Sequence, residues 1–329
     1  PGIVKLSGPM QADGDVPLNS PFVFSPNSEY VVFRADADID ETLELFSART
    51  NGDGDPVRLN GLLGTGAIVW SYAVTPDSER VVYIAPQETT GVSELFVVDI
   101  DGGQAQKLSH TLTIDGNVWN FKLSPDGERV VYVAVQDASE VLELYSVPVA
   151  GGTPLKLNGA LVANGDVVDY EITPDSQRVI YRADQKADEV VELFSVPIAG
   201  GTAVTLNLPL VAGGDVNNYW IDPDSEWVVY IADQQTNDVL ELYYVAIGGG
   251  LPVKQSAPLV AGGDVFAARI SPDGSRVIYY ADQQIDEYYE LYSAPVASTA
   301  AVKLNGSLVT GGDIVYFAIS PTGDRVIYR

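Results

Sequence analysis

The chain has 329 residues, of which 46% are hydrophobic, and it contains a single histidine and no cysteine. This composition predicts a folded protein with a sizeable core, and it excludes thiolate or multi-histidine zinc sites, cysteine nucleophiles and disulfides. The formal net charge of −27 disfavours nucleic acids and anionic lipid surfaces as partners, and no apolar run reaches the roughly 18 residues that a membrane-spanning segment needs.

One nine-residue pattern recurs along the whole chain, first as "SPNSEYVVF" and last as "SPTGDRVIY". The seven copies begin at Ser25, Thr75, Ser124, Thr173, Asp222, Ser271 and Ser320. The first spacing is 50 residues and each later spacing is 49 residues. So constant a period leaves no room for an inserted domain, and we therefore expect a single domain over residues 1–329.

Each repeat has the pattern of four short strands. In the copy that starts at Asp264, four segments are rich in Val, Ile, Tyr and Phe and are bounded by Gly, Pro, Asp or Asn. In chain order they are 264–270, 275–281, 290–296 and 301–306. The "SPDG" between the first two supplies Pro, which fixes φ at the second turn position, and Gly, which allows a positive φ, so we expect a tight hairpin there.

Four antiparallel strands per repeat and seven repeats predict an all-β fold, a seven-bladed β-propeller whose four-stranded blades stack on their neighbours. A straight solenoid would need polar capping repeats, which neither end provides. The third strand, marked by "ELF" or "ELY", occurs six times, whereas "IVKLSG" at 3–8 matches the fourth strand "AVKLNG" at 301–306. We expect the N-terminal strand to close the ring as the outer strand of the last blade, which lacks its third strand. Further chain or a partner would donate that strand.

The "SPDGxRVVY" strand followed by "ELYSV" resembles the PD40 repeats of TolB-like propellers over nearly the whole chain. Such propellers serve as periplasmic interaction modules and as non-catalytic gates of peptidases. The resemblance implies binding rather than chemistry. We therefore expect a binding or scaffold module of an exported, bacterial-type protein, with a protein, peptide or glycan as its partner. The absence of cysteine agrees with an extracellular or periplasmic location.

Acidic side chains recur in the links between repeats and in the loops between second and third strands, which should share one face. The candidate cation ligands are Asp166, Asp215, Asp264 and Asp313 in the links and Asp36, Asp38 and Asp40 in one loop. Each link Asp could accept a backbone N–H and shape its turn, or the Asp residues together could bind Ca²⁺, another cation or a basic peptide at the channel mouth. The spacing of the loop Asp residues resembles the start of a calcium loop, but Glu41 and Ser47 replace the usual Gly and Glu. Calcium is the one cofactor that we consider.

Departures from the repeat mark candidate ligand-binding residues on the first strands. They are Trp70, Trp119, Asp169, Glu171, Trp220, Arg269 and Tyr316. The two tryptophans at equivalent positions, Trp70 and Trp119, could form an aromatic floor for a sugar or a peptide side chain. Trp70 and Trp119 stand two residues before Tyr72 and Phe121, so on a regular strand they would point to the same side as these aromatic residues. This favours packing between blades instead.

Catalysis is the alternative function. No GxSxG nucleophile elbow is present, so a prolyl-oligopeptidase-like peptidase centre is missing. Asp169 and Glu171 could act as paired carboxylates in a propeller that cleaves a glycan or a peptide in its channel. Because acidic residues are so frequent in this chain, we expect binding rather than catalysis.

Overall fold

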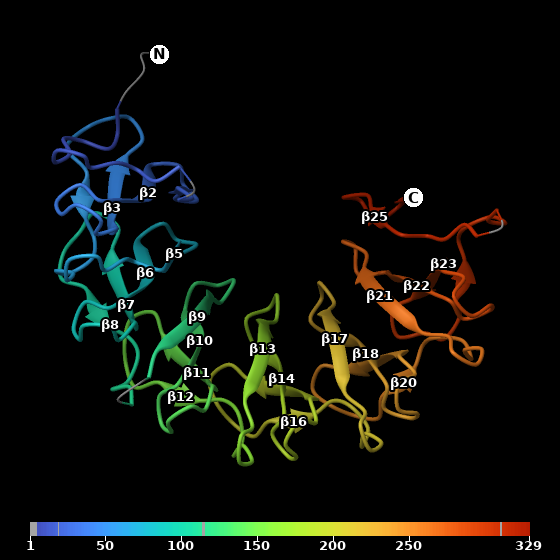
Figure 1. Ribbon diagram of the computed structural model, residues 1–329. Helices are drawn as coiled ribbons and strands as arrows, with labels where there is room; N and C mark the ends of the chain where they lie inside the picture. Colours follow the sequence, from blue (N-terminus) through green and yellow to red (C-terminus); the bar gives the residue numbers. More distant parts are fainter. Residues whose placement is uncertain (1–4, 19, 114–115, 310) are drawn as a thin grey trace. The chain divides into compact units, whose positions relative to one another are not determined.

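The computed structural model describes residues 5–18, 20–113, 116–309 and 311–329. Within this part of the chain the backbone forms six four-stranded antiparallel sheets and one two-stranded sheet, and contains no helix that could cross a membrane. The chain divides into two compact units, one of Pro1–Asn158 and Ile198–Gly200, the other of Gly159–Pro197 and Gly201–Arg329. Figure 1 shows the sheets of each unit following one another in chain order.

Each four-stranded sheet consists of one repeat with its strands in sequence order. The first strands are β1 (Val23–Phe24), β5 (Ser71–Val74), β9 (Val118–Leu123), β13 (Val167–Ile172), β17 (Val216–Ile221), β21 (Val265–Ile270) and β25 (Phe317–Ile319). The second strands are β2 (Tyr30–Ala35), β6 (Arg80–Ala85), β10 (Arg129–Ala134), β14 (Arg178–Ala183), β18 (Trp227–Ala232), β22 (Arg276–Ala281) and β26 (Val326–Tyr328).

The third strands are β3 (Glu44–Arg49), β7 (Glu94–Asp99), β11 (Glu143–Pro148), β15 (Glu192–Pro197), β19 (Glu241–Ala246) and β23 (Glu290–Pro295). The fourth strands are β4 (Val57–Arg58), β8 (Gln106–Lys107), β12 (Leu155–Lys156), β16 (Val204–Thr205), β20 (Val253–Lys254) and β24 (Val302–Lys303). The prediction of four strands per repeat is thus confirmed for six repeats, although each fourth strand is only two residues long.

The hairpin predicted between the first two strands is confirmed. In the third repeat, Gly127 has a φ of 74° and its N–H donates to the carbonyl of Ser124 at 2.8 Å. The Ser124 hydroxyl accepts the Arg129 N–H at 2.9 Å, which closes the turn from its other side. Where Gly is absent, Ser takes the positive φ, as at Ser78 with 67°, and its hydroxyl accepts the Asn27 N–H of the preceding turn at 3.0 Å.

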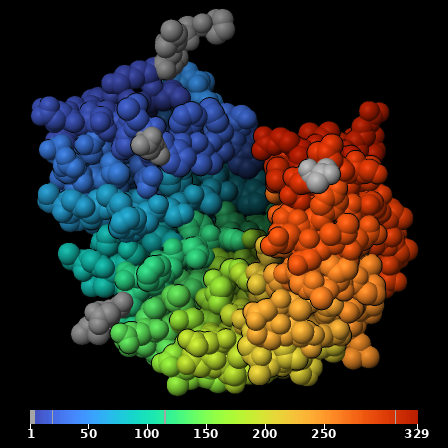
Figure 2. Space-filling model, turned by 45° about the vertical axis from the view of Figure 1, so that its right-hand side comes forward, coloured from blue at the N-terminus to red at the C-terminus, as the bar shows by residue number. Residues whose placement is uncertain are grey.

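Consecutive sheets within a unit stack face to face. In the first unit, Val82 and Leu95 of the second sheet pack against Val130 and Tyr132 of the third. In the second unit, Val229 and Leu242 pack against Val277 and Tyr279 in the same way, and Figure 2 shows the side chains of successive repeats in contact within each unit. The second strands β6, β18 and β22 are apolar on both sides because their sheets pack against other residues on both faces. This is the packing expected between propeller blades.

Buried polar groups in the sheets are paired across strands. The carboxylate of Glu143, which begins β11, binds Lys156 Nζ of β12 at 2.7 Å and accepts the Tyr145 hydroxyl at 2.7 Å. Between sheets, the side-chain oxygen of Gln136 accepts the Tyr132 hydroxyl at 2.9 Å and the His110 N–H of the preceding repeat at 3.2 Å. Such pairs satisfy groups that would otherwise lose their hydrogen bonds on burial.

The last repeat forms a sheet of two strands, β25 and β26, in the described residues. The expected closing strand begins at Ile3, and Ile3 and Val4 lie outside the described residues. Ring closure, the number of blades and a donated third strand therefore stay predictions.

Candidate functional site

A β-bulge interrupts the first strand of several repeats near its beginning. In β9, Asn120 pairs with Val133 and Val118 pairs with Ala134, so that Trp119 between them has no partner on β10. The same shift occurs in β13, β17 and β21, where the extra residues are Val168, Asn217 and Phe266. A bulge re-aims the side chain of its extra residue. In each of these four repeats the side chain of the extra residue is exposed.

The bulge position carries Trp119, and Trp70 has the equivalent place in the preceding repeat. Their side chains are 66% and 60% exposed, and both line a cavity of about 440 Å³ together with Ser93 and Asn117. The interpretation that these tryptophans pack between blades is therefore wrong. It assumed strict alternation along the strand, whereas the extra residue moves the tryptophan out of phase with the rest of the strand.

Two polar side chains hold the backbone around this cavity. Arg34 Nη1 of β2 donates to the carbonyls of Val69 and Trp70 at 2.8 and 3.2 Å. Asn117 Oδ1 accepts the Ser93 N–H at 2.8 Å. Sequence reasoning missed Arg34, although a signal exists. Ile, Val or Tyr takes its place in four repeats, whereas arginine recurs at Arg329 and at one further counterpart in the second unit.

That counterpart is Arg182 of β14, which donates through Nη1 to the carbonyls of Val216 and Asn217 at the bulge of β17. Its Nε also binds both carboxylate oxygens of Asp169 at 3.1 Å. Asp169, a predicted ligand-binding residue, is thus held within the sheet by an ion pair. The arrangement does not present Asp169 and Glu171 as two equivalent free carboxylates.

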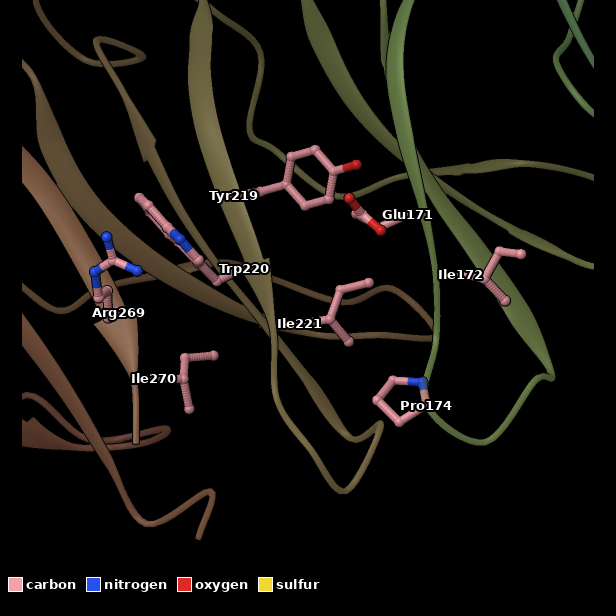
Figure 3. A pocket seen from close by; sticks show the side chains of 8 residues that line it. All are labelled: Glu171, Ile172, Pro174, Tyr219, Trp220, Ile221, Arg269 and Ile270. Atoms are coloured by element: carbon pink, nitrogen blue, oxygen red, sulfur yellow. The ribbon is translucent and has the colours of Figure 1, made fainter. Parts of the chain in front are cut away.

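A second cavity, of about 510 Å³, lies near the other ends of β13, β17 and β21 (Figure 3). It brings together three predicted ligand-binding residues, Glu171, Trp220 and Arg269, which occupy the same position in consecutive repeats. The remaining lining residues are Ile172, Pro174, Tyr219, Ile221 and Ile270. Tyr316, the last predicted ligand-binding residue, is exposed and lies in neither cavity.

Tyr219 forms part of the wall of this second cavity. Its hydroxyl donates to the carbonyl of Ile180 at 3.2 Å. Burial raises the pKa of Tyr219 well above its ordinary value, and the nearby carboxylates of Asp169 and Glu171 raise it further. Tyr219 is therefore a protonated hydrogen-bond donor at neutral pH.

The link aspartates serve the backbone. Asp264 Oδ1 accepts the Leu240 N–H of the preceding repeat at 2.7 Å, and the Asp264 N–H donates to Asp282 Oδ1 at 2.5 Å. The further bonds of this kind are Asp215 Oδ1 with Val191 N–H at 2.7 Å, Asp313 Oδ1 with Tyr289 N–H at 3.0 Å, and Asp166 N–H with Asp184 Oδ1 at 2.5 Å. The carboxylates of Asp215, Asp264 and Asp313 accept the backbone N–H groups that the structural alternative required, and all these bonds join loops to links within the second unit.

The three aspartates of the first acidic loop have different environments. Asp36 is buried and accepts the Asp15 N–H, Asp38 pairs with Arg58 at 3.0 Å, and Asp40 is exposed. No group of three or more His, Asp or Glu side chains in the described part of the chain is arranged to hold a metal ion. The calcium prediction stays a prediction.

No family model matches the chain, and no curated protein matches it. Solved structures to which it is similar include a putative TolB from Agrobacterium tumefaciens, at 16% identity over 71% of this chain and 79% of that chain, with a TM-score of 0.41. TolB from Acinetobacter baumannii is 14% identical over 86% of this chain and 62% of that chain, with a TM-score of 0.39. An oligogalacturonate lyase in complex with manganese is 12% identical over 88% of this chain and 92% of that chain, with a TM-score of 0.46. At these identities and TM-scores the likenesses assign neither a family nor a function.

Proposed function

We propose that this protein is a non-catalytic binding module with propeller-type blades, and that Trp70 and Trp119 form its ligand platform. The observation that carries this proposal is the pair of tryptophans at equivalent positions of consecutive repeats, both more than half exposed and both lining one cavity. Exposing two large indoles to water is unfavourable for folding, so a ligand that covers them gains that apolar contact.

The ligand that suits this platform best is a neutral glycan. Flat indole faces take the apolar face of a sugar ring, while Ser93 and Asn117 supply polar groups beside them. An uncharged ligand also avoids the repulsion that the net charge of −27 imposes on anions. An apolar peptide side chain is the competing ligand, and the experiment below separates the two.

The wider setting of the module is part of the same proposal. The stacked sheets within each unit support propeller-type blades. Closure of the ring by the N-terminal strand and a donated third strand in the last blade are further parts of the proposal. The absence of cysteine supports an exported, extracellular or periplasmic protein. The acidic loops would then attract cations such as calcium or basic partners. Catalysis gains no support, because Asp169 is engaged by Arg182.

The proposal is tested by calorimetric titration with neutral hexasaccharides of glucose and xylose and with an uncharged tryptophan-containing peptide. We expect a glycan to bind, and Trp70→Ala and Trp119→Ala each to lower its affinity at least about tenfold, as central aromatic anchors do. Leu62→Ala is the matched control, because Leu62 is an apolar side chain of similar exposure, 74%, outside the cavity.

Stability distinguishes a platform from a packing role. Both tryptophan variants should unfold in urea within about 0.5 kcal/mol of the wild type, since exposed substitutions rarely cost more. A loss of several kcal/mol, or glycan binding that survives both substitutions, would overturn the proposal. Binding of the peptide alone would replace the glycan by a peptide ligand.

A further inference from the structure

Arg269 is an unusual cation in this chain. It lines the second cavity and is exposed, and it has no ion pair or hydrogen bond with any of the described residues. The neighbouring arginines behave differently, because Arg182 pairs with Asp169 and Arg276 Nε donates to Ser293 Oγ at 2.6 Å. In a chain with 45 acidic and 18 basic residues, a guanidinium without a carboxylate partner is available for a ligand.

The surroundings of Arg269 provide an apolar surface for the rest of that ligand. Trp220 lies beside Arg269, as Figure 3 shows, and its ring is half-buried against the core that includes Val229 and Val277. Ile221 and Ile270 follow Trp220 and Arg269 on their strands and line the same cavity.

We propose that this cavity binds a carboxylate carried on an aromatic or aliphatic body. The carboxylate pairs with the planar fork of Arg269, which matches its two oxygens. The body lies against Trp220 and the isoleucines. This is a second site, in the second unit, with a ligand class different from that of the tryptophan platform, and it stands independently of the proposed function.

Charge restricts the ligand further. Glu171 lies on another side of the cavity, beside Tyr219. The net charge of −27 also repels an anion at long range, whereas the contact with Arg269 acts at short range. Added salt screens long-range repulsion, so the association rate of the ligand should rise between about 20 mM and about 150 mM NaCl, when the Debye length shortens to about 8 Å.

The test compares two probes that differ only in charge, N-acetyl-phenylalanine and its neutral amide, by calorimetry on the whole chain. We expect the acid to bind at least about tenfold more tightly, equivalent to about 1.4 kcal/mol. Arg269→Gln should reduce the acid to the affinity of the amide. Arg325→Gln is the matched control, because Arg325 is 84% exposed and lies outside the cavity. This substitution changes the net charge by the same amount as Arg269→Gln.

Trp220→Phe should weaken the acid and the amide by the same factor, since both carry the aromatic body. A third probe, N-acetyl-aspartyl-phenylalaninamide, places the carboxylate on a side chain inside a peptide. Tighter binding of this probe than of N-acetyl-phenylalanine would identify the bound carboxylate as that of an acidic residue inside a peptide. Tighter binding of N-acetyl-phenylalanine would identify it as a terminal carboxylate. Equal affinity of acid and amide, no binding of either at millimolar concentration, or an unchanged preference in Arg269→Gln would each overturn the proposal.

Discussion

Asp264 distinguishes a structural role of the link aspartates from a ligand-binding role. Its carboxylate accepts the Leu240 N–H, and burial raises its pKa above the ordinary value of 3.8, with Asp282, Asp233 and Asp238 raising it further. The decisive substitutions are Asp264→Asn and Asp264→Ala. Asparagine keeps the acceptor oxygen and removes the charge, whereas alanine removes both.

The magnitudes follow from the single bond that Asp264 makes to the preceding repeat. Asp264→Ala leaves the part-buried Leu240 N–H without its partner, which costs about 0.5–1.5 kcal/mol, the typical net contribution of one hydrogen bond. Asp264→Asn keeps an amide oxygen in place, as Asn117 does naturally for the Ser93 N–H at 2.8 Å. Its stability at pH 7 should equal or exceed that of the wild type by up to about 1 kcal/mol, since the bond survives and the repulsion disappears.

The pH dependence has a definite sign. The pKa of Asp264 is higher in the folded state, so the folded protein binds this proton more tightly than the unfolded chain does. The contribution of Asp264 to stability is therefore fully present below pH 3.8 and declines as the pH rises through the folded pKa. Asn has no such titration. The stability of Asp264→Asn relative to the wild type should therefore increase from acid to neutral pH.

Urea unfolding followed by circular dichroism at about pH 3, 5 and 7 measures these differences. Equal stability of Asp264→Ala and Asp264→Asn would refute the role of the hydrogen bond. An advantage of Asp264→Asn that is largest at acid pH would refute the electrostatic reasoning.

Other perturbations test the remaining buried and cation-binding features. Tyr292→Phe removes the hydroxyl that donates to buried Glu290 at 2.9 Å, so its free energy of unfolding in urea should fall by about 1.5–3 kcal/mol; an unchanged value would contradict this. Phe96→Tyr should raise the free energy of unfolding. Its new hydroxyl could donate to Glu94 Oε2, a buried oxygen that has no partner in the described part of the chain. Arg34→Ile should cost a similar 1.5–3 kcal/mol and weaken glycan binding at Trp70, and full glycan affinity in this variant would show that the arginine does not position the platform. If calcium binds the acidic loops, millimolar Ca²⁺ should raise the unfolding temperature, and no shift would contradict the calcium prediction.

Much of the fold could be predicted because it depends on local chemistry that recurs every 49 residues. Pro and a residue with positive φ determine the hairpin wherever they occur, and β-branched and aromatic runs determine the strands. The residue with positive φ in this turn follows a longer-range rule. It is Ser in four of the seven repeats, and at Ser78 and Ser225 its hydroxyl accepts a backbone N–H from the turn of the preceding repeat.

The candidate sites could be predicted only in part. Departures from the repeat identified Glu171, Trp220 and Arg269, which the fold does bring to one cavity. Alternation along a strand misplaced Trp119, because alternation holds only where the two strands stay in register.

The sequence by itself determined the repeat, the order of strands within each sheet and the hairpin turns, because each depends on residues that are neighbours along the chain. Tertiary structure decided the direction of Trp119, since a bulge depends on how two strands pair and not on the identity of the residue that it displaces. It also decided which charges remain available to a ligand. Arg182 and Arg269 both lie on strands of the second unit, but within the described residues only Arg182 forms an ion pair, with Asp169. Asp169 lies opposite Arg182 only because β13 and β14 pair.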